Sequence, residues 1–311
     1  MTGYVLQRLL ATVPVVLGIL LATFLIQAAI PTDAVGALFQ GQMTEAEAAE
    51  TMALLRERYR LDLPWHERFG HYLLQLAQGD LGESVRTREP VADEIGWRYL
   101  NTIKLAAAAL VIAVVLGLGL GLLAAWKRGS WLDTLCTSVS LVGVSTPGFA
   151  FGLLMLLVFA VWLRWVPVLA EGWQALLLPA LTLGLIEAAP LARVARSAMV
   201  EVLGSEFVRA ARAKGMSEAA VLIHHALPNA LLGVVTLVGL QIGSLLGGAF
   251  IIEVVFGWPG IGELAVQAVQ WRDFAITQAV ILVGALTYVG VNVAVDCLYA
   301  VIDPRVKLGA P

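Results

Sequence analysis

The chain alternates between long uncharged apolar runs and short polar stretches. A helix needs about 20 mainly apolar residues to cross a bilayer, and six runs reach or approach that length. The six predicted membrane helices cover residues 9–30, 102–126, 134–163, 172–192, 229–253 and 274–302. The third contains a Ser-Thr-Pro-Gly sequence at 145–148, where we expect a break because proline has no N–H to donate. The pattern therefore predicts an all-α membrane protein.

Lys and Arg are unevenly distributed between the two sets of short connections. One side holds only Arg164 and Arg272, whereas ten Lys and Arg residues fall on the other side. The richer side faces the cytoplasm in membrane proteins, so we predict that both termini are cytoplasmic. The long connection 31–101 is then a large outer loop after the first helix. It can form a lid over the outer helix ends, a docking surface for an external partner, or both.

The composition supports a membrane location and excludes several protein classes. Hydrophobic residues make up 59% of the chain and charged residues only 14%, against about 25% charged in soluble domains. A single soluble core cannot bury so much apolar surface. This excludes a water-soluble enzyme, a disordered chain and a nucleic-acid binder. Cys136 and Cys297 lie in apolar runs, so we expect neither a disulfide framework nor a metal site.

The inner connection 193–228 is too long for a simple turn and is predicted to form a helical hairpin. Ser205 and Ser217 are suitable N-caps for its helices. Gly215 fits the left-handed position that follows a helix end. The two short helices are predicted over 206–214 and 218–224.

The first hairpin helix has a small apolar face. Phe207, Ala210 and Ala211 recur at the spacing of one helix face, and Arg209 and Arg212 lie beside it. The basic residues alone fit an ordinary cytoplasmic loop. A small apolar face between arginines also suits a knob that enters a groove of another protein.

These residues resemble a known family motif. Residues 209–215, followed by Leu227-Pro228, resemble the cytoplasmic EAA loop of ABC-importer permeases. The chain keeps the two alanines, the glycine and the Leu-Pro at the family spacing. It departs at Arg209, which replaces Glu as is common in the peptide-importer branch, and at His225, which replaces Ile and affects a packing contact.

Other segments agree with this resemblance, which extends from about Tyr4 to Leu308. The large outer loop and the segment 79–84 are similar to those of the B-type permease subunit of dipeptide and oligopeptide importers. Residues similar to that branch's structural signatures are Trp258, Pro259, Gly260 and Gly262 in an outer loop, and Asp296, Asp303, Pro304 and Arg305 near the C-terminus.

The resemblance implies a single permease domain over 1–311 in the bacterial inner membrane. It forms half of a translocation pathway with a second, C-type permease subunit. Two ABC ATPase subunits bind ATP and Mg, and an extracytoplasmic solute-binding protein delivers a di- or oligopeptide. Nickel chelates and glutathione are the alternative substrates within the family. The implied ATPase-coupling residues are Ser205, Glu206, Phe207, Arg209, Ala210, Ala211, Arg212, Lys214, Gly215, Leu227 and Pro228.

The chain has no nucleotide-binding motif of its own. A P-loop needs a lysine directly after a glycine, and none of the four lysines follows one. We therefore predict that the chain is not an enzyme, has no catalytic residues, and needs no cofactor of its own. A secondary transporter would need charges or broken helices in paired midplane positions. The sequence gives only weak hints of such positions, at Pro147 and Pro179. The EAA-like hairpin does not favour a scaffold without transport.

Polar residues within the predicted helices have two interpretations. They are candidates for lining a polar pathway, although each such residue alone more often makes a hydrogen bond between helices. These residues are Ser145, Thr146, Gln241, Ser244, Thr287 and Asn292. Glu187 and Glu253 lie near helix ends, where we expect them to reach water. Asp296 is expected to pair with a basic group or a helix end.

Small residues recur every four positions in two of the predicted helices. Gly117, Gly121 and Ala125 form one such stripe, and Gly239 and Gly243 belong to another. Stripes of this kind allow helices to approach closely, so we expect these positions to pack against neighbouring helices.

Overall fold

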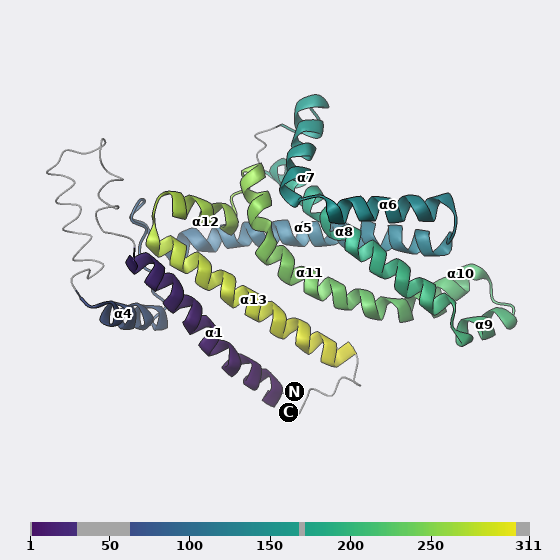
Figure 1. Cartoon of the computed structure of the whole chain (residues 1–311), viewed down its shortest axis with the longest axis horizontal. Coiled ribbons are helices and arrows are strands. Elements are labelled where there is room, and N and C mark those ends of the chain that lie inside the picture. The colour runs from purple at the N-terminus through teal and green to yellow at the C-terminus, as the bar shows by residue number, and fades with distance from the viewer. Residues whose placement is uncertain (1, 30–62, 168–171, 303–311) are drawn as a thin grey trace. The chain divides into compact units, whose positions relative to one another are not determined.

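The computed structural model describes residues 2–29, 63–167 and 172–302 (Figure 1). Side chains are described within these ranges except at 2–9, 27–29, 232, 247–248 and 296–302. The helices are α1 (Thr2–Ala29), α4 (Trp65–Ala77), α5 (Val91–Trp126), α6 (Trp131–Ser145), α7 (Gly148–Met155), η1 (Leu156–Trp162), α8 (Trp173–Leu203), α9 (Glu206–Ala213), α10 (Glu218–Ala220), η2 (Val221–Ala226), α11 (Leu227–Phe256), α12 (Ile261–Gln270) and α13 (Phe274–Ile302). Here η1 and η2 are π-helices.

The chain divides into two compact units. The first combines Met1–Val5, Tyr99–Glu263 and Thr287–Pro311, and the second combines Leu6–Arg98 with Leu264–Leu286. Each unit is described below by itself.

The core of the first unit lies where α5, α8 and α11 meet. Leu105 of α5, Leu183 of α8 and Leu245 of α11 are buried in one cluster. A second cluster joins Leu191 of α8 to Val234 of α11. Buried apolar side chains on three helices thus tie this unit together along much of its length.

The glycine stripe of α5 is pressed against α8, as the sequence predicts. A Cβ atom at Gly117 would lie 2.8 Å from Leu191 Cβ and 3.0 Å from the carbonyl oxygen of Ala188. At Gly121 it would lie 2.5 Å from the carbonyl oxygen of Ala192. The two backbones approach too closely for any larger residue. The second stripe packs against α13, because a Cβ atom at Gly239 would lie 3.2 Å from a methyl carbon of Val295.

The second unit contains an aromatic cluster and a polar latch. Phe24 of α1 packs against Phe69 of α4, with ring centroids 5.3 Å apart. Asp273 is buried and caps α13, because its Oδ1 accepts a hydrogen bond from the N–H of Ile276 at 3.2 Å. Its Oδ2 also accepts from the Ser84 hydroxyl at 2.6 Å. Asp273 therefore fixes the loop before α5 to the start of α13.

Several helices extend beyond their predicted bounds. The predicted second span begins at 102, but α5 already begins at Val91 and includes the polar turns before it. The predicted fourth span ends at 192, whereas α8 continues to Leu203. No helix is predicted from the sequence over 261–270, where the structure has α12, Ile261–Gln270. The sixth predicted span, 274–302, agrees with α13.

The predicted third span is not one tilted helix. The helices α6 and α7 meet at an angle of 109°. Thr146 has an extended backbone with ψ of 125°, because a residue before proline is disfavoured in the helical region. Pro147 then precedes α7 and lacks an N–H group. The break falls within the predicted Ser-Thr-Pro-Gly sequence, but its angle is much larger than a tilted helix requires.

Three helical segments of the described residues are long and apolar enough to cross a membrane: Val91–Trp126, Trp173–Leu203 and Phe274–Val295. Three bent pairs also pass if each is taken as one span, which gives up to six spans among the residues described. Leu10–Ile26 of α1 forms a shorter apolar helix. These lengths fit a protein that crosses a membrane several times.

Candidate functional site

The predicted hairpin is formed by α9 and by a second arm that leads into α11. Figure 1 shows α9 and α10 together at one end of α8 and α11. The chain turns at Gly215, whose φ of +80° confirms the predicted left-handed position. The second arm differs from the prediction of a separate helix over 218–224. It runs through α10 and η2 directly into α11, because Leu227 keeps a helical backbone.

The two predicted serine caps differ in the structure. The hydroxyl oxygen of Ser217 accepts a hydrogen bond from the N–H of Ala220 at 3.3 Å, as expected of an N-cap. Ser205 occupies the N-cap position of α9, but its hydroxyl donates to the carbonyl oxygen of Val202 at 2.5 Å. The predicted capping bond of Ser205 is therefore wrong, and its side chain ties the hairpin to the last turn of α8 instead.

The hairpin has a small apolar interior of its own. Val208 and Ala211 of α9 are buried against Val221 of the second arm, and Leu203 and Met216 pack around them. The prediction that Ala211 lies on the outer apolar face is therefore wrong. The helix buries the Val208 side, so Phe207 and Ala210 remain outside while Ala211 faces inward. The interior holds α9 firmly on the end of α8.

The outer surface of the hairpin combines an aromatic ring with basic side chains. Phe207 is 45% exposed although it is a large apolar residue. Arg209 lies beside it and forms an exposed ion pair with Glu206 at 3.0 Å. Arg212 donates through Nε and Nη2 to the two carboxylate oxygens of Glu218 at 2.8 and 3.1 Å. Lys214 is also exposed.

The Leu-Pro pair lies where the second arm becomes α11. Leu227 packs against the cluster of Met199, Ala226 and Ala230. The N–H of Leu227 reaches back five residues to Leu222, as in a π-helix. Pro228 has no N–H, and the α-helical hydrogen-bond pattern begins at this point. The Leu-Pro pair therefore marks the change from π-helical to α-helical hydrogen bonding, at a point where Leu227 is well packed.

The segment 257–263, which contains the outer-loop signature, surrounds a buried carboxylate at the opposite end of α11. Glu253 is completely buried. Its Oε1 accepts a hydrogen bond from the Thr102 hydroxyl at 2.7 Å. Its Oε2 accepts from the N–H groups of Gly262 at 2.6 Å and Glu263 at 3.3 Å. A carboxylate is favoured there because it meets the free N–H groups at the start of α12. The prediction that Glu253 reaches water is wrong.

The signature residues are explained by this arrangement. A Cβ atom at Gly260 would collide with the Glu253 carboxylate, and one at Gly262 would collide with Phe250. Trp258 is buried, and its indole N–H donates to the carbonyl oxygen of Asn101 at 3.1 Å. The carbonyl oxygen of Pro259 accepts from the Asn101 side chain at 3.1 Å. The signature thus fixes the loop around Glu253 and against α5.

The candidate pathway residues fall into local groups. Gln241 is buried and donates to the carbonyl oxygen of Glu187 at 2.7 Å. Ser244 donates to the Glu187 carboxylate at 3.3 Å. Thr287 shares a 2.7 Å hydrogen bond with Tyr99. The three remaining candidates are Ser145 and Thr146, at the α6–α7 break, and the half-buried Asn292. Their part in a pathway stays a prediction.

The C-terminal signature lies outside what is described. Asp303, Pro304 and Arg305 fall beyond the last described residue, and no side chain is described for Asp296. The predicted pairing of Asp296 therefore stays a prediction. Among the described residues, no group of three or more His, Cys, Asp or Glu side chains lies close enough to hold a metal ion.

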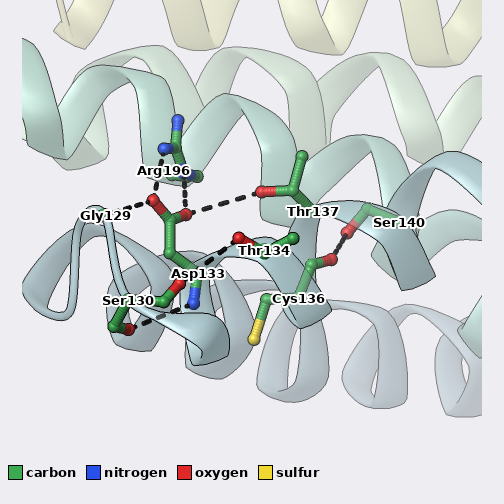
Figure 2. A network of polar contacts seen from close by, with 8 residues as sticks. All are labelled: Gly129, Ser130, Asp133, Thr134, Cys136, Thr137, Ser140 and Arg196. Carbon is green, nitrogen blue, oxygen red and sulfur yellow. Dashed lines mark hydrogen bonds and ion pairs between the residues drawn. The ribbon is translucent and has the colours of Figure 1, made fainter.

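One polar contact was not predicted from the sequence. Asp133 of α6 and Arg196 of α8 form an ion pair at 2.6 Å (Figure 2). The signal was present, since each is a charged residue beside a long apolar run. Sequence spacing alone could not pair two residues so far apart.

Comparison with known proteins places the chain in a family. Residues 117–308 match the family model described as "Binding-protein-dependent transport system inner membrane component". The glutathione transport system permease protein GsiC of Escherichia coli (strain K12) is 42% identical over 308 residues, covering 99% of both chains. GsiC of Salmonella typhimurium (strain LT2) is 41% identical with the same coverage.

Solved structures support the same fold. A chain of the inward-facing MetNI methionine ABC transporter aligns with a TM-score of 0.56 and 18% identity, covering 67% of this chain and 96% of that chain. An amino acid ABC transporter crystallised with histidines gives a TM-score of 0.55 at 18% identity, covering 67% of this chain and 94% of that chain. The helical fold, the hairpin and the matches along nearly the whole chain agree. The chain belongs to the binding-protein-dependent transport system inner membrane component family, and is thus a multi-pass inner-membrane permease subunit of an ABC importer rather than its ATPase.

Proposed function

We propose that this permease subunit imports glutathione, driven by ATPase subunits that dock on the α9 hairpin. The substrate proposal is supported by relatives called glutathione transport permeases, which match 99% of the chain at 41–42% identity. Glutathione is itself a short peptide, so the proposal narrows the di- or oligopeptide import expected from the sequence. Longer peptides and nickel chelates are the competing substrates in the transport experiment below.

The proposed assembly follows from the subunit's family. One permease domain with six spans and cytoplasmic termini pairs with a second permease subunit, and the pathway lies between them. Two ATPase subunits bind ATP on the cytoplasmic side, and an external solute-binding protein delivers the substrate. A permease without a P-loop depends on such subunits for energy, and none of the lysines of this chain follows a glycine.

The ordered hairpin is the observation that carries the docking proposal. Phe207 and Arg209 stand exposed on α9, whereas Val208 and Ala211 anchor the same helix from within. An aromatic side chain on a rigid base loses little conformational freedom when a partner covers it. Aromatic and arginine side chains are also the residues that most often dominate interface affinity.

Transport in liposomes tests the substrate. The full complex, with both permeases, both ATPases and its binding protein, is reconstituted with ATP inside the vesicles. We expect binding-protein-dependent uptake of labelled glutathione in excess over a dipeptide, a pentapeptide or a nickel chelate. Preferred uptake of any of those three would contradict the proposal.

The Phe207→Ala variant tests the docking surface. We expect at least about tenfold weaker association of the ATPase with the purified permease pair, since loss of an aromatic anchor typically costs more than 1.4 kcal/mol. Ile223→Ala is the matched control, because Ile223 is 58% exposed on the second arm and outside the proposed contact. Wild-type affinity in Phe207→Ala would contradict docking at this face. Ala211→Glu is unsuitable, because it would bury a charge inside the hairpin.

A further inference from the structure

The contact between Asp133 and Arg196 joins α6 to α8 close to the hairpin. The Arg196 Nε atom donates to Asp133 Oδ1 at 2.6 Å, and Nη2 donates to Oδ2 at 2.8 Å (Figure 2). Both carboxylate oxygens thus meet the same planar guanidinium. Such a two-bond fork fixes direction as well as distance. Arg196 lies in the final two turns of α8, which ends at Leu203, just before α9 begins.

Asp133 is itself held firmly at the start of α6. Asp133 is only 6% exposed to solvent. The N–H of Gly129 donates to Oδ2 at 3.0 Å, and the Thr137 hydroxyl donates to Oδ1 at 3.5 Å (Figure 2). Ser130 caps the helix by accepting from the N–H of Asp133 at 3.4 Å. The Asp133 carboxylate thus joins three parts of the chain in one polar cluster. These parts are the α5–α6 turn, the first turns of α6, and Arg196 of α8.

The hairpin is packed directly onto this part of α8. Leu203 and Val202 pack into the hairpin interior with Val208. Met199 is buried in the cluster that includes Ala226 of the second arm. Every turn of α8 from the hairpin back to Arg196 is therefore packed on another element of the same unit.

The far end of α6 is the break before α7. The helix stops at Ser145, and α7 leaves at 109° after Pro147. Near the C-terminal end of α6, next to the break, the contact with α8 is close, because a Cβ atom at Gly143 would lie 2.9 Å from Ala189 Cβ. Apolar contact of this kind resists separation but gives little resistance to sliding. The ion pair adds a directional contact at the hairpin end.

We propose that Asp133 and Arg196 are positioning residues that transmit movement of the docked hairpin from α8 to α6, and so to the α6–α7 break. The inference rests on the proposed function, in which ATPase subunits move the hairpin. Neither residue touches nucleotide or substrate in this role. The two-bond ion pair sets the position of α6 on α8. ATPase binding at the hairpin then shifts the α6–α7 break, because the ATPase contacts one arrangement of the helices better than the other.

Two variants separate positioning from stability. Arg196→Lys keeps the charge but removes the fork, since an ammonium group cannot bind both carboxylate oxygens in one plane. The double variant Asp133→Leu with Arg196→Met replaces the pair by apolar side chains, a change that often preserves stability. Arg193→Lys is the matched control, because Arg193 is exposed on the same helix.

The measurement uses the whole complex in liposomes with its solute-binding protein. We record ATPase co-purification, basal ATP hydrolysis, and the stimulation of hydrolysis by substrate-loaded binding protein. Both variants should keep assembly and basal hydrolysis, while stimulation falls at least about fivefold, the lower range of typical coupling between sites. Arg193→Lys should keep wild-type stimulation.

Two results would overturn the inference. One is wild-type stimulation in both variants. The other is a fall in stimulation that only matches a fall in assembled complex, which would show a structural role alone. Failure of the proposed function appears instead in the wild-type complex, as an absence of glutathione uptake or of binding-protein stimulation, before any variant is compared.

Discussion

Two carboxylates in the first unit are buried with different sets of partners, because both accept hydrogen bonds from backbone N–H and hydroxyl groups but Asp133 also meets a guanidinium. Glu253, at the end of α11 away from the hairpin, is held by a hydroxyl and two backbone N–H groups. Asp133, near the hairpin, is held by the guanidinium of Arg196. The first arrangement shapes one loop from its own backbone. The second joins two helices through side chains that reach toward water, since the Arg196 side chain is 29% exposed.

This difference predicts how each site tolerates change. Backbone donors cannot rotate away from an altered partner, so a substitution at Glu253 or in its loop leaves buried polar groups unsatisfied. An arginine that reaches solvent can be hydrated when its partner is lost, which reduces the penalty. Substitutions at the Glu253 site should therefore lower the free energy of unfolding more than comparable substitutions at the Asp133 site.

The largest effect is expected for Gly262→Ala. The new methyl group would collide with the backbone and ring of Phe250, and with the Glu253 carboxylate. Because a backbone atom cannot move aside, we expect a loss of at least about 3 kcal/mol, at the upper end of overpacking costs. Thermal unfolding of the purified permease measures it. Gly119→Ala is the control, since apart from the adjoining backbone of its own helix no atom lies within 4 Å of its Cβ position, and it should be neutral or slightly stabilising.

An intermediate effect is expected for Glu253→Gln. The amide keeps the shape but turns an N–H₂ group toward the N–H groups of Gly262 and Glu263, or toward Thr102. We expect a loss of about 2 kcal/mol, typical of a buried group left unsatisfied. The same unfolding measurement applies, with exposed Glu201→Gln as control. If Glu253→Gln is as stable as Glu201→Gln, the Thr102 hydroxyl and the N–H groups of the loop do not need a charged acceptor, which would contradict the prediction.

The smallest effect is expected for Asp133→Asn. One fork bond is lost, but Arg196 remains partly hydrated, so we expect about 1 kcal/mol. The loss should shrink at high salt, because screening weakens a charge pair near solvent. Exposed Asp93→Asn serves as control. A loss equal to that of Glu253→Gln, or one insensitive to salt, would contradict the comparison between the two sites.

Local signals in the sequence predicted several features correctly. The turn at Gly215, the cap at Ser217 and the helix 274–302 depend on neighbouring residues alone. The close approach at Gly117 and Gly121 also followed from a local repeat. Such features need no knowledge of the partner element, because backbone conformation and residue size determine them.

Other features depend on contacts between distant segments and were missed. Nothing near Glu253 in sequence shows that Thr102 donates to it, so an end-of-helix position suggested water instead. Ala211 and Phe207 share one helix face by spacing, but the second arm at Val221 decides which side is buried. The Asp133–Arg196 pair likewise exists only once α6 and α8 lie together.

The wide turn of η2 has a consequence for the direction in which the hairpin faces. A π-helical turn accommodates one residue more than an α-helix over the same rise, and η2 lies between the hairpin turn and α11. Removing a single residue from Val221–Ala226 would restore a regular α-helix. Because the π turn holds its extra residue in nearly the same rotation, the segment before it would keep nearly the same direction around the α11 axis. Phe207 would then stay on the same side of the helix although the second arm had become one residue shorter, so this single turn lets the chain hold an extra residue without turning the hairpin away.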